Sequence, residues 1–195
     1  MEYAFHYYNK FAADGAAIAL KKLLFHDLEK KGDFTPTDPP VIVCVGSDLA
    51  IGDSLGPVTG SMLRRKTQGV NAYIYGTLTN PITAKEIAHL RTFLKETHPN
   101  SQIIAVDAAV GAQGDIGLIK LLSTPLHPGA GANKKLGAIG DISIMGIVAE
   151  KSVANYGLLN GTRLNLVYTM SERISDALSE LLWHYNTQKY AKTQP

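Results

Sequence analysis

The sequence predicts an α/β protein, a three-layer α/β/α sandwich built around a mainly parallel sheet. From Val41 onward, short continuous apolar runs recur, as expected for parallel strands that are buried on both faces. Helical stretches separate these runs, and right-handed crossovers then place helices on both faces of the sheet. The expected strands are residues 41–45, 72–75, 102–108, 116–122, 141–148 and 163–169.

A helix is predicted before the first strand, over residues 11–31. Its apolar side chains recur at helical spacing with charged residues between them: Ile18, Leu20, Leu23, Leu24 and Leu28. The segment 35–40 contains three prolines and cannot continue the helix, because proline lacks the backbone donor. We therefore expect an N-terminal helix and linker over 1–40, followed by the α/β unit over 41–190, together forming one compact domain.

Three further helices are predicted within the α/β unit. The first runs from near Pro57 toward Arg65, after the first strand. The second starts at a capping box formed by Thr83 and Glu86 and ends near Thr97. In the third, Ser171 is the expected N-cap, and the polar tail 187–195 is expected to fray. This helix carries one apolar stripe: Ile174, Leu178, Leu181, Leu182 and Tyr185.

Composition excludes several classes of protein. The chain has 195 residues, of which 45% are hydrophobic and 18% charged, so it is neither disordered nor a coiled coil. The formal charge of +2 is not clustered, so no nucleic-acid partner is expected. No segment has the ~18 uninterrupted apolar residues of a membrane span, and we expect a cytoplasmic protein without a membrane partner. The single cysteine, Cys44, lies in an apolar run and is expected to be a buried thiol.

The loop after the first strand presents an acid. Residues 46–57 contain several glycines but match neither the dinucleotide-binding spacing nor the P-loop. In a P-loop a lysine follows the second glycine, whereas here Asp53 follows Gly52. A carboxylate beside a helix N-terminus repels phosphate but is itself favoured by the helix dipole. A purely structural alternative is that Asp53 or Ser54 caps the following helix.

A second acid follows from the third strand. Asp107 ends an otherwise apolar run. Burying a carboxylate there costs free energy unless the group is paired, hydrogen-bonded or part of a functional site. If the first and third strands flank the point where the strand order reverses, Asp53 and Asp107 face one another. Two close carboxylates titrate as a pair, and one of them keeps a proton. Such a pair is suited to general acid/base attack of water on an amide.

A third loop is expected at the same sheet edge. Residues 125–135 are too rich in glycine and proline for regular structure, and binding loops often have this composition. The alternative is a plain surface loop, in which His127 is merely solvated.

The runs CVGSDLAIGDSLGP, IAVDAAVG and HPGAGANKK, in this order and spacing, resemble the YyaC family of sporulation proteins. That family is similar to the germination protease of spore-forming bacteria. The resemblance covers most of residues 41–169. It implies the α/β sandwich of the phosphorylase/hydrolase type, shared with hydrogenase-maturation endopeptidases.

The resemblance also implies roles for individual residues. In the germination protease, the aspartates that match Asp53 and Asp107 are thought to form an aspartic-type catalytic pair. Its Pro-Gly-x-Gly-x-x-Asn pattern is matched here by Pro128, Gly129 and Gly131 and, one position earlier than in the pattern, by Asn133. We therefore expect a substrate-binding set around the catalytic pair: Gly52, Ser54, His127, Gly129, Gly131 and Asn133.

The function implied is an endopeptidase that cleaves a protein during sporulation or germination, with small spore proteins as the expected substrate. The compartment would be the cytoplasm of the spore or mother cell, and a homo-oligomer is compatible with this. No cofactor or metal is expected. Two alternatives stay open. One is a metal-dependent maturation-type peptidase that uses Asp53, Asp107 and His127, because the hydrogenase relatives recognise nickel through a Glu, an Asp and a His. The other is a non-catalytic binding module on the same fold.

Overall fold

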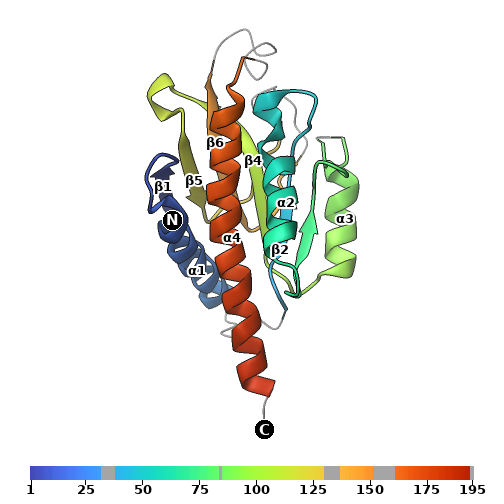
Figure 1. Ribbon diagram of the computed structural model, residues 1–195. Coiled ribbons are helices and arrows are strands. Elements are labelled where there is room, and N and C mark those ends of the chain that lie inside the picture. Colours follow the sequence, from blue (N-terminus) through green and yellow to red (C-terminus); the bar gives the residue numbers. More distant parts are fainter. Residues whose placement is uncertain (32–37, 84, 130–136, 152–160, 194–195) are drawn as a thin grey trace.

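A computed structural model describes residues 1–31, 38–83, 85–129, 137–151 and 161–193 (Figure 1). Within them the chain forms helices, strands and two short 3-10 turns, η1 and η2. The helices are α1 (Ala12–Lys31), α2 (Leu55–Lys66), α3 (Ile87–Thr97) and α4 (Leu164–Thr193). The strands are β1 (Glu2–His6), β2 (Val41–Cys44), β3 (Tyr73–Tyr75), β4 (Ile103–Gly111), β5 (Leu118–Leu122) and β6 (Ile142–Glu150), and the turns are η1 (Ile51–Ser54) and η2 (Gln113–Asp115).

The strands form one mixed sheet in the order β1-β5-β6-β4-β2-β3. The segment β6-β4-β2-β3 is parallel throughout, whereas β5 runs antiparallel to both β6 and β1. The prediction of a mainly parallel sheet is therefore confirmed. The antiparallel part lies at one edge, where β5 follows β4 after a short turn rather than after a crossover helix.

Helices cover both faces of the sheet, which confirms the three layers. Helices α1, α2 and α4 share one core cluster with the strand residues Ile42, Cys44, Ile104 and Val106. Helix α3 packs on the opposite face, against Val41, Val43 and Ala105. In Figure 1, α2 and α4 lie side by side in front of the sheet, and α3 lies at its β3 edge.

Three predictions about the C-terminal part are wrong. Residues 163–169 do not form a strand: α4 starts at Leu164, because Val167, Met170 and Ile174 are all buried at helical spacing. Ser171 is consequently inside α4 and not its N-cap. The tail that was expected to fray from residue 187 continues as helix to Thr193.

Other differences are local. Strand β1, which the sequence did not predict, pairs with β5 and packs Phe5 against Gly15 of α1. Ile18 is 54% exposed and does not belong to the buried stripe of α1, which is made mainly of alanine and leucine. Helix α3 starts only at Ile87, although Glu86 accepts the expected hydrogen bond from the Thr83 amide at 2.9 Å.

Helix α2 lies unusually close to the sheet because two of its residues are glycines. A Cβ at Gly56 would come within 2.0 Å of the Val45 carbonyl oxygen, and one at Gly60 within 1.9 Å of the Gly76 carbonyl oxygen. Between them, the Cys44 thiol is fully buried, and burial raises its pKa to about 12, so this thiol is inert as expected. The close contact holds the start of α2 against the end of β2. Among the residues described, no helix has the length and apolar character needed to cross a membrane.

Candidate active site

The strand order reverses at β2. Strand β3 follows β2 in the chain and lies on one side of it, whereas β4 follows β3 and lies on the other side. The carboxyl ends of β2 and β4 therefore meet at the topological switch point, where open α/β sheets bind their ligands. This confirms the expected neighbourhood of the first and third predicted strands, here β2 and β4.

Asp107 lies at this point. The last residue of β2, Cys44, pairs with Val106, so Asp107 is the first residue of β4 that extends beyond β2. The strand does not end at Asp107, contrary to the sequence prediction. It continues to Gly111 because its other neighbour, β6, continues alongside it and pairs Met145 with Asp107. Successive side chains of a strand point to opposite faces of the sheet. Asp107 therefore faces away from the side of Val106 and toward the side of Ala105, which α3 covers.

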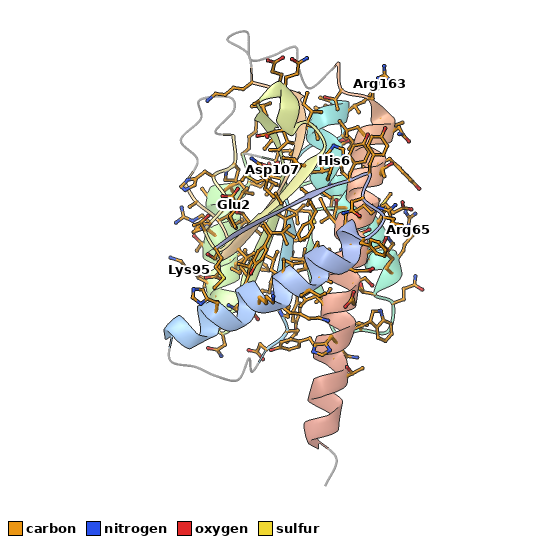
Figure 2. The ribbon with its side chains drawn as sticks, turned by 90° about the vertical axis from the view of Figure 1, so that its left-hand side faces the viewer. Glu2, His6, Arg65, Lys95, Asp107 and Arg163 are labelled. Atoms are coloured by element: carbon orange, nitrogen blue, oxygen red, sulfur yellow. The ribbon has the colours of Figure 1, made fainter. Side chains whose placement is uncertain are left out.

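The Asp107 side chain is buried, and its residue is only 9% exposed. Figure 2 shows it within the body of the molecule, in contrast to Arg65 and Lys95 at the periphery. Burial, followed by the negative charge of Asp53, raises the pKa of Asp107 well above its ordinary value. The Ala108 amide donates to Asp107 Oδ1 at 2.8 Å, which opposes this shift without overcoming it. Burial and the Asp53 charge thus favour the protonated form of Asp107.

Asp53 is held in η1, the turn between β2 and α2. The chain folds back here because Gly46 adopts φ +137, and a Cβ at this position would lie 2.1 Å from the Asp53 carbonyl oxygen. The Ser47 amide donates to that same oxygen at 3.1 Å and closes the loop. The Asp53 side chain is half-buried, next to the N-terminus of α2, where the helix dipole favours a negative charge.

The capping alternative fails for Ser54. Ser54 is the N-cap residue of α2, but its side chain makes no capping hydrogen bond. Its hydroxyl donates instead to the Ile51 carbonyl at 2.7 Å, within η1. Asp53 precedes the cap position by one residue, and Gly52 beside it is buried. Ser54 and Gly52 therefore shape the turn that carries Asp53.

The third predicted loop is only partly described. Leu126 and Ile139 pair across its base and are buried in the α3-side cluster, the same side of the sheet that Asp107 faces. His127 is exposed, and Gly129 has φ +72. Gly131 and Asn133 lie outside the described residues. Among the residues described, no three His, Cys, Asp or Glu side chains gather into a metal-binding group, so His127 does not complete a donor set with the two aspartates.

Sequence reasoning missed one contact that supports the site. The Ser171 hydroxyl of α4 donates to the Leu55 carbonyl at 3.1 Å, and both residues are fully buried. This bond ties α4 to the first turn of α2, two residues after Asp53. The signal in the sequence is a serine between the apolar residues Met170 and Ile174, a pattern that also fits the N-cap predicted from the sequence.

Fold and site together define an open α/β protein with two aspartates at the switch point of its sheet. Comparison with known proteins then places the chain in a family: it belongs to the family described as "Protein of unknown function (DUF1256)", which matches residues 6–177. The chain is 39% identical over 141 residues to the "Uncharacterized protein YyaC" of Bacillus subtilis (strain 168), covering 72% of this chain and 68% of that protein. The expected relationship to the YyaC family is thereby confirmed.

Among solved structures, the chain is similar to a [NiFe] hydrogenase maturation protease, HycI, from Thermococcus kodakarensis KOD1. The TM-score is 0.47 and the identity 16%, over 74% of this chain and 92% of that one.

Proposed function

We propose that this protein is an endopeptidase that hydrolyses a peptide bond of a protein substrate with the pair Asp53 and Asp107. The observation that carries the proposal is the buried Asp107, whose pKa is raised by burial and by the charge of Asp53. A protonated and an ionised carboxyl group at one switch point are the two partners that acid/base hydrolysis of an amide requires.

We assign the roles of the two acids from their environments. Asp53, half-buried at the N-terminus of α2, is the ionised member and takes a proton from the attacking water. The water oxygen bonds to the scissile carbonyl carbon, while Asp107 donates its proton to the carbonyl oxygen. As the tetrahedral intermediate collapses, the carbon–nitrogen bond breaks, the nitrogen takes the proton held by Asp53, and the hydroxyl proton returns to Asp107. Both aspartates end in their starting states.

The Ala108 amide selects which oxygen of Asp107 acts. Because Oδ1 already accepts the Ala108 hydrogen bond, Oδ2 is the oxygen that carries the proton. A fixed donor oxygen matches a role in which the proton must point toward a bound carbonyl group.

Resemblance to the germination protease supports the biological setting. The matching motifs carry both aspartates, and they favour a small spore protein as substrate and the spore or mother-cell cytoplasm as the compartment. Binding of the substrate is assigned to the loops that flank the pair, with Gly52 and Ser54 on one side and the loop that contains His127 and Gly129 on the other.

The test is cleavage of purified candidate spore proteins by the full chain, read by intact mass so that any new terminus is identified. We compare wild type with Asp53→Asn, Asp107→Asn and the double variant. Asp48→Asn is the matched control, because Asp48 is an exposed aspartate in the same loop.

Each single substitution at the pair should lower the cleavage rate by at least about 100-fold, the usual contribution of a positioned acid or base. The double variant should lose little more, because two residues that act as one unit are not additive. Asp48→Asn should cleave at the wild-type rate. Full activity in either single variant overturns the pair mechanism, and a folded wild type that cleaves none of the candidates favours a non-catalytic binding module.

A further inference from the structure

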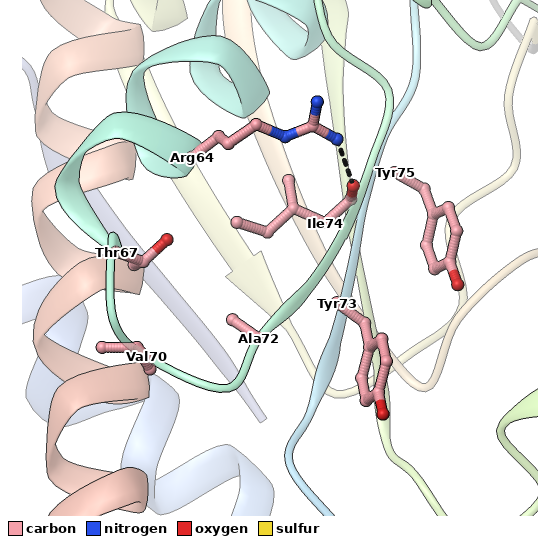
Figure 3. Close-up of a pocket in the computed structure, with 7 residues that line it drawn as sticks. All are labelled: Arg64, Thr67, Val70, Ala72, Tyr73, Ile74 and Tyr75. Carbon is pink, nitrogen blue, oxygen red and sulfur yellow. Dashed lines mark hydrogen bonds between the residues drawn. The ribbon is translucent and has the colours of Figure 1, made fainter.

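A concave site lies at the opposite end of α2 from Asp53, between the last turn of this helix and β3 (Figure 3). Its volume is about 360 Å³, within the range of roughly 300–1,000 Å³ typical of small-molecule pockets. The twelve residues of α2 span about 18 Å, so the two sites are separate. Nothing in the proposed peptidase mechanism uses this pocket.

Besides Arg64 and Thr67, the pocket is lined by Tyr73 and Tyr75, whose rings lie across β3 from the Ile74 side chain in Figure 3. The floor of the pocket is the aliphatic part of this mixed lining. Val70, Ala72 and Ile74 line it, and all three are only half-buried although they pack against the main core cluster. In Figure 3 the Ile74 side chain points from β3 toward Thr67 on the facing side. The Thr67 hydroxyl is already used, since it donates to the Leu63 carbonyl at 2.8 Å. The side chains of the floor are therefore aliphatic, and the Thr67 hydroxyl that faces them is not free.

One cation lies above this floor. The Arg64 guanidinium donates to the Ile74 carbonyl at 3.3 Å, which holds it across the pocket. Within the described part of the chain, no carboxylate pairs with Arg64. Lys66, two residues later, differs in this respect because it forms an ion pair with Asp176 at 2.6 Å. A guanidinium group has five N–H donors, so most of those on Arg64 remain available for a ligand.

We propose that this pocket binds a small monocarboxylate with an apolar body. The carboxylate would accept two parallel hydrogen bonds from Arg64, the geometry for which a guanidinium group is suited. The apolar body would cover Val70, Ala72 and Ile74. A neutral apolar molecule leaves Arg64 without an anionic partner, and a fully polar anion leaves the aliphatic side chains of the floor exposed to water. Neither ligand therefore matches both parts of the pocket.

Sodium hexanoate is the probe for the test, titrated into the full chain at neutral pH. Tryptophan fluorescence provides a local readout, because the single tryptophan, Trp183, donates its indole N–H to the Lys66 carbonyl at 3.2 Å, next to Thr67 of the pocket. Amide shifts in a nitrogen-15 NMR spectrum locate the site. Saturable changes confined to residues 64–75 and Trp183 are expected with hexanoate, whereas acetate and hexan-1-ol should bind at least about fivefold more weakly.

Two neighbouring arginines supply matched variants. Arg64→Gln should weaken hexanoate binding about tenfold, and Arg65→Gln, the adjacent exposed arginine that does not line the pocket, should leave it unchanged. Ala72→Leu fills the floor and should also weaken binding while Arg64 stays in place. The proposal is overturned if hexanoate produces no saturable change, if hexan-1-ol binds equally well, or if Arg65→Gln weakens binding as much as Arg64→Gln. These readouts do not depend on peptidase activity, so the two proposals fail independently.

Discussion

Replacing Asp107 by asparagine should make the protein more stable at neutral pH. The substitution is nearly isosteric, and the asparagine side-chain oxygen can still accept the Ala108 amide that now bonds Oδ1 at 2.8 Å. It removes an ionisable group from a buried position close to Asp53. The variant should therefore fold as the wild type does while losing the acid that the proposed reaction requires.

The direction of the pKa shift determines how this gain in stability depends on pH. Burial and Asp53 raise the pKa of Asp107 in the native state, whereas an unfolded aspartate titrates near pH 4. Between these two values the native state holds one proton more than the unfolded state, so the free energy of unfolding falls as the pH rises. The loss is about 1.4 kcal/mol per pH unit. It is absent below about pH 4 and complete once the pH exceeds the native pKa.

Urea-induced unfolding of wild type and Asp107→Asn at pH 4, 5, 6 and 7 measures this difference. The stability advantage of the variant should be smallest at pH 4 and should grow with pH by about 1.4 kcal/mol per unit until the native carboxyl ionises. Asp48→Asn controls for the change in net charge at an exposed position. A difference between variant and wild type that stays constant from pH 4 to pH 7 would refute the raised pKa of native Asp107.

Two further predictions concern how α2 is held. Gly60→Ala would place a Cβ 1.9 Å from the Gly76 carbonyl oxygen, and because backbone faces backbone the helix must move; we expect a loss of about 3 kcal/mol in urea unfolding. Gly114→Ala, with no atom within 4 Å of the new Cβ, should change stability by less than about 0.5 kcal/mol, and equal losses at both positions would contradict the close approach. Ser171→Ala removes the hydrogen bond to Leu55 and should cost about 1 kcal/mol, lowering the melting temperature by roughly 2–4 °C at this chain length. An unchanged melting temperature would show that this bond does not stabilise the contact between α2 and α4.

Much of the fold could be predicted because the relevant signals are local. Five of the six expected strands are present, since each is marked by a short, mainly apolar run that can be identified without knowing the rest of the fold. The error at residues 163–169 has the same origin. A short apolar run is equally compatible with a strand or with the start of a buried helix, and only the packing of Val167 and Met170 in the core decides between them. Strand β1 was missed because an edge strand of five residues, with every side chain half-buried or exposed, has no apolar run to mark it.

Local sequence patterns alone point to the residues that we propose for chemistry: an acid in a glycine-rich turn, an acid at the end of an apolar run, and a loop too rich in glycine and proline to be regular. They do not determine that Asp53 and Asp107 interact, because that depends on β2 and β4 being neighbours, and strand order is set by contacts between segments far apart in the chain. The raised pKa of Asp107 likewise comes from the tertiary structure. Burial, which excludes water, and the charge of Asp53 both raise this pKa. Burial requires the packed sheet and helices, and Asp53 acts on Asp107 only because β2 and β4 are neighbours.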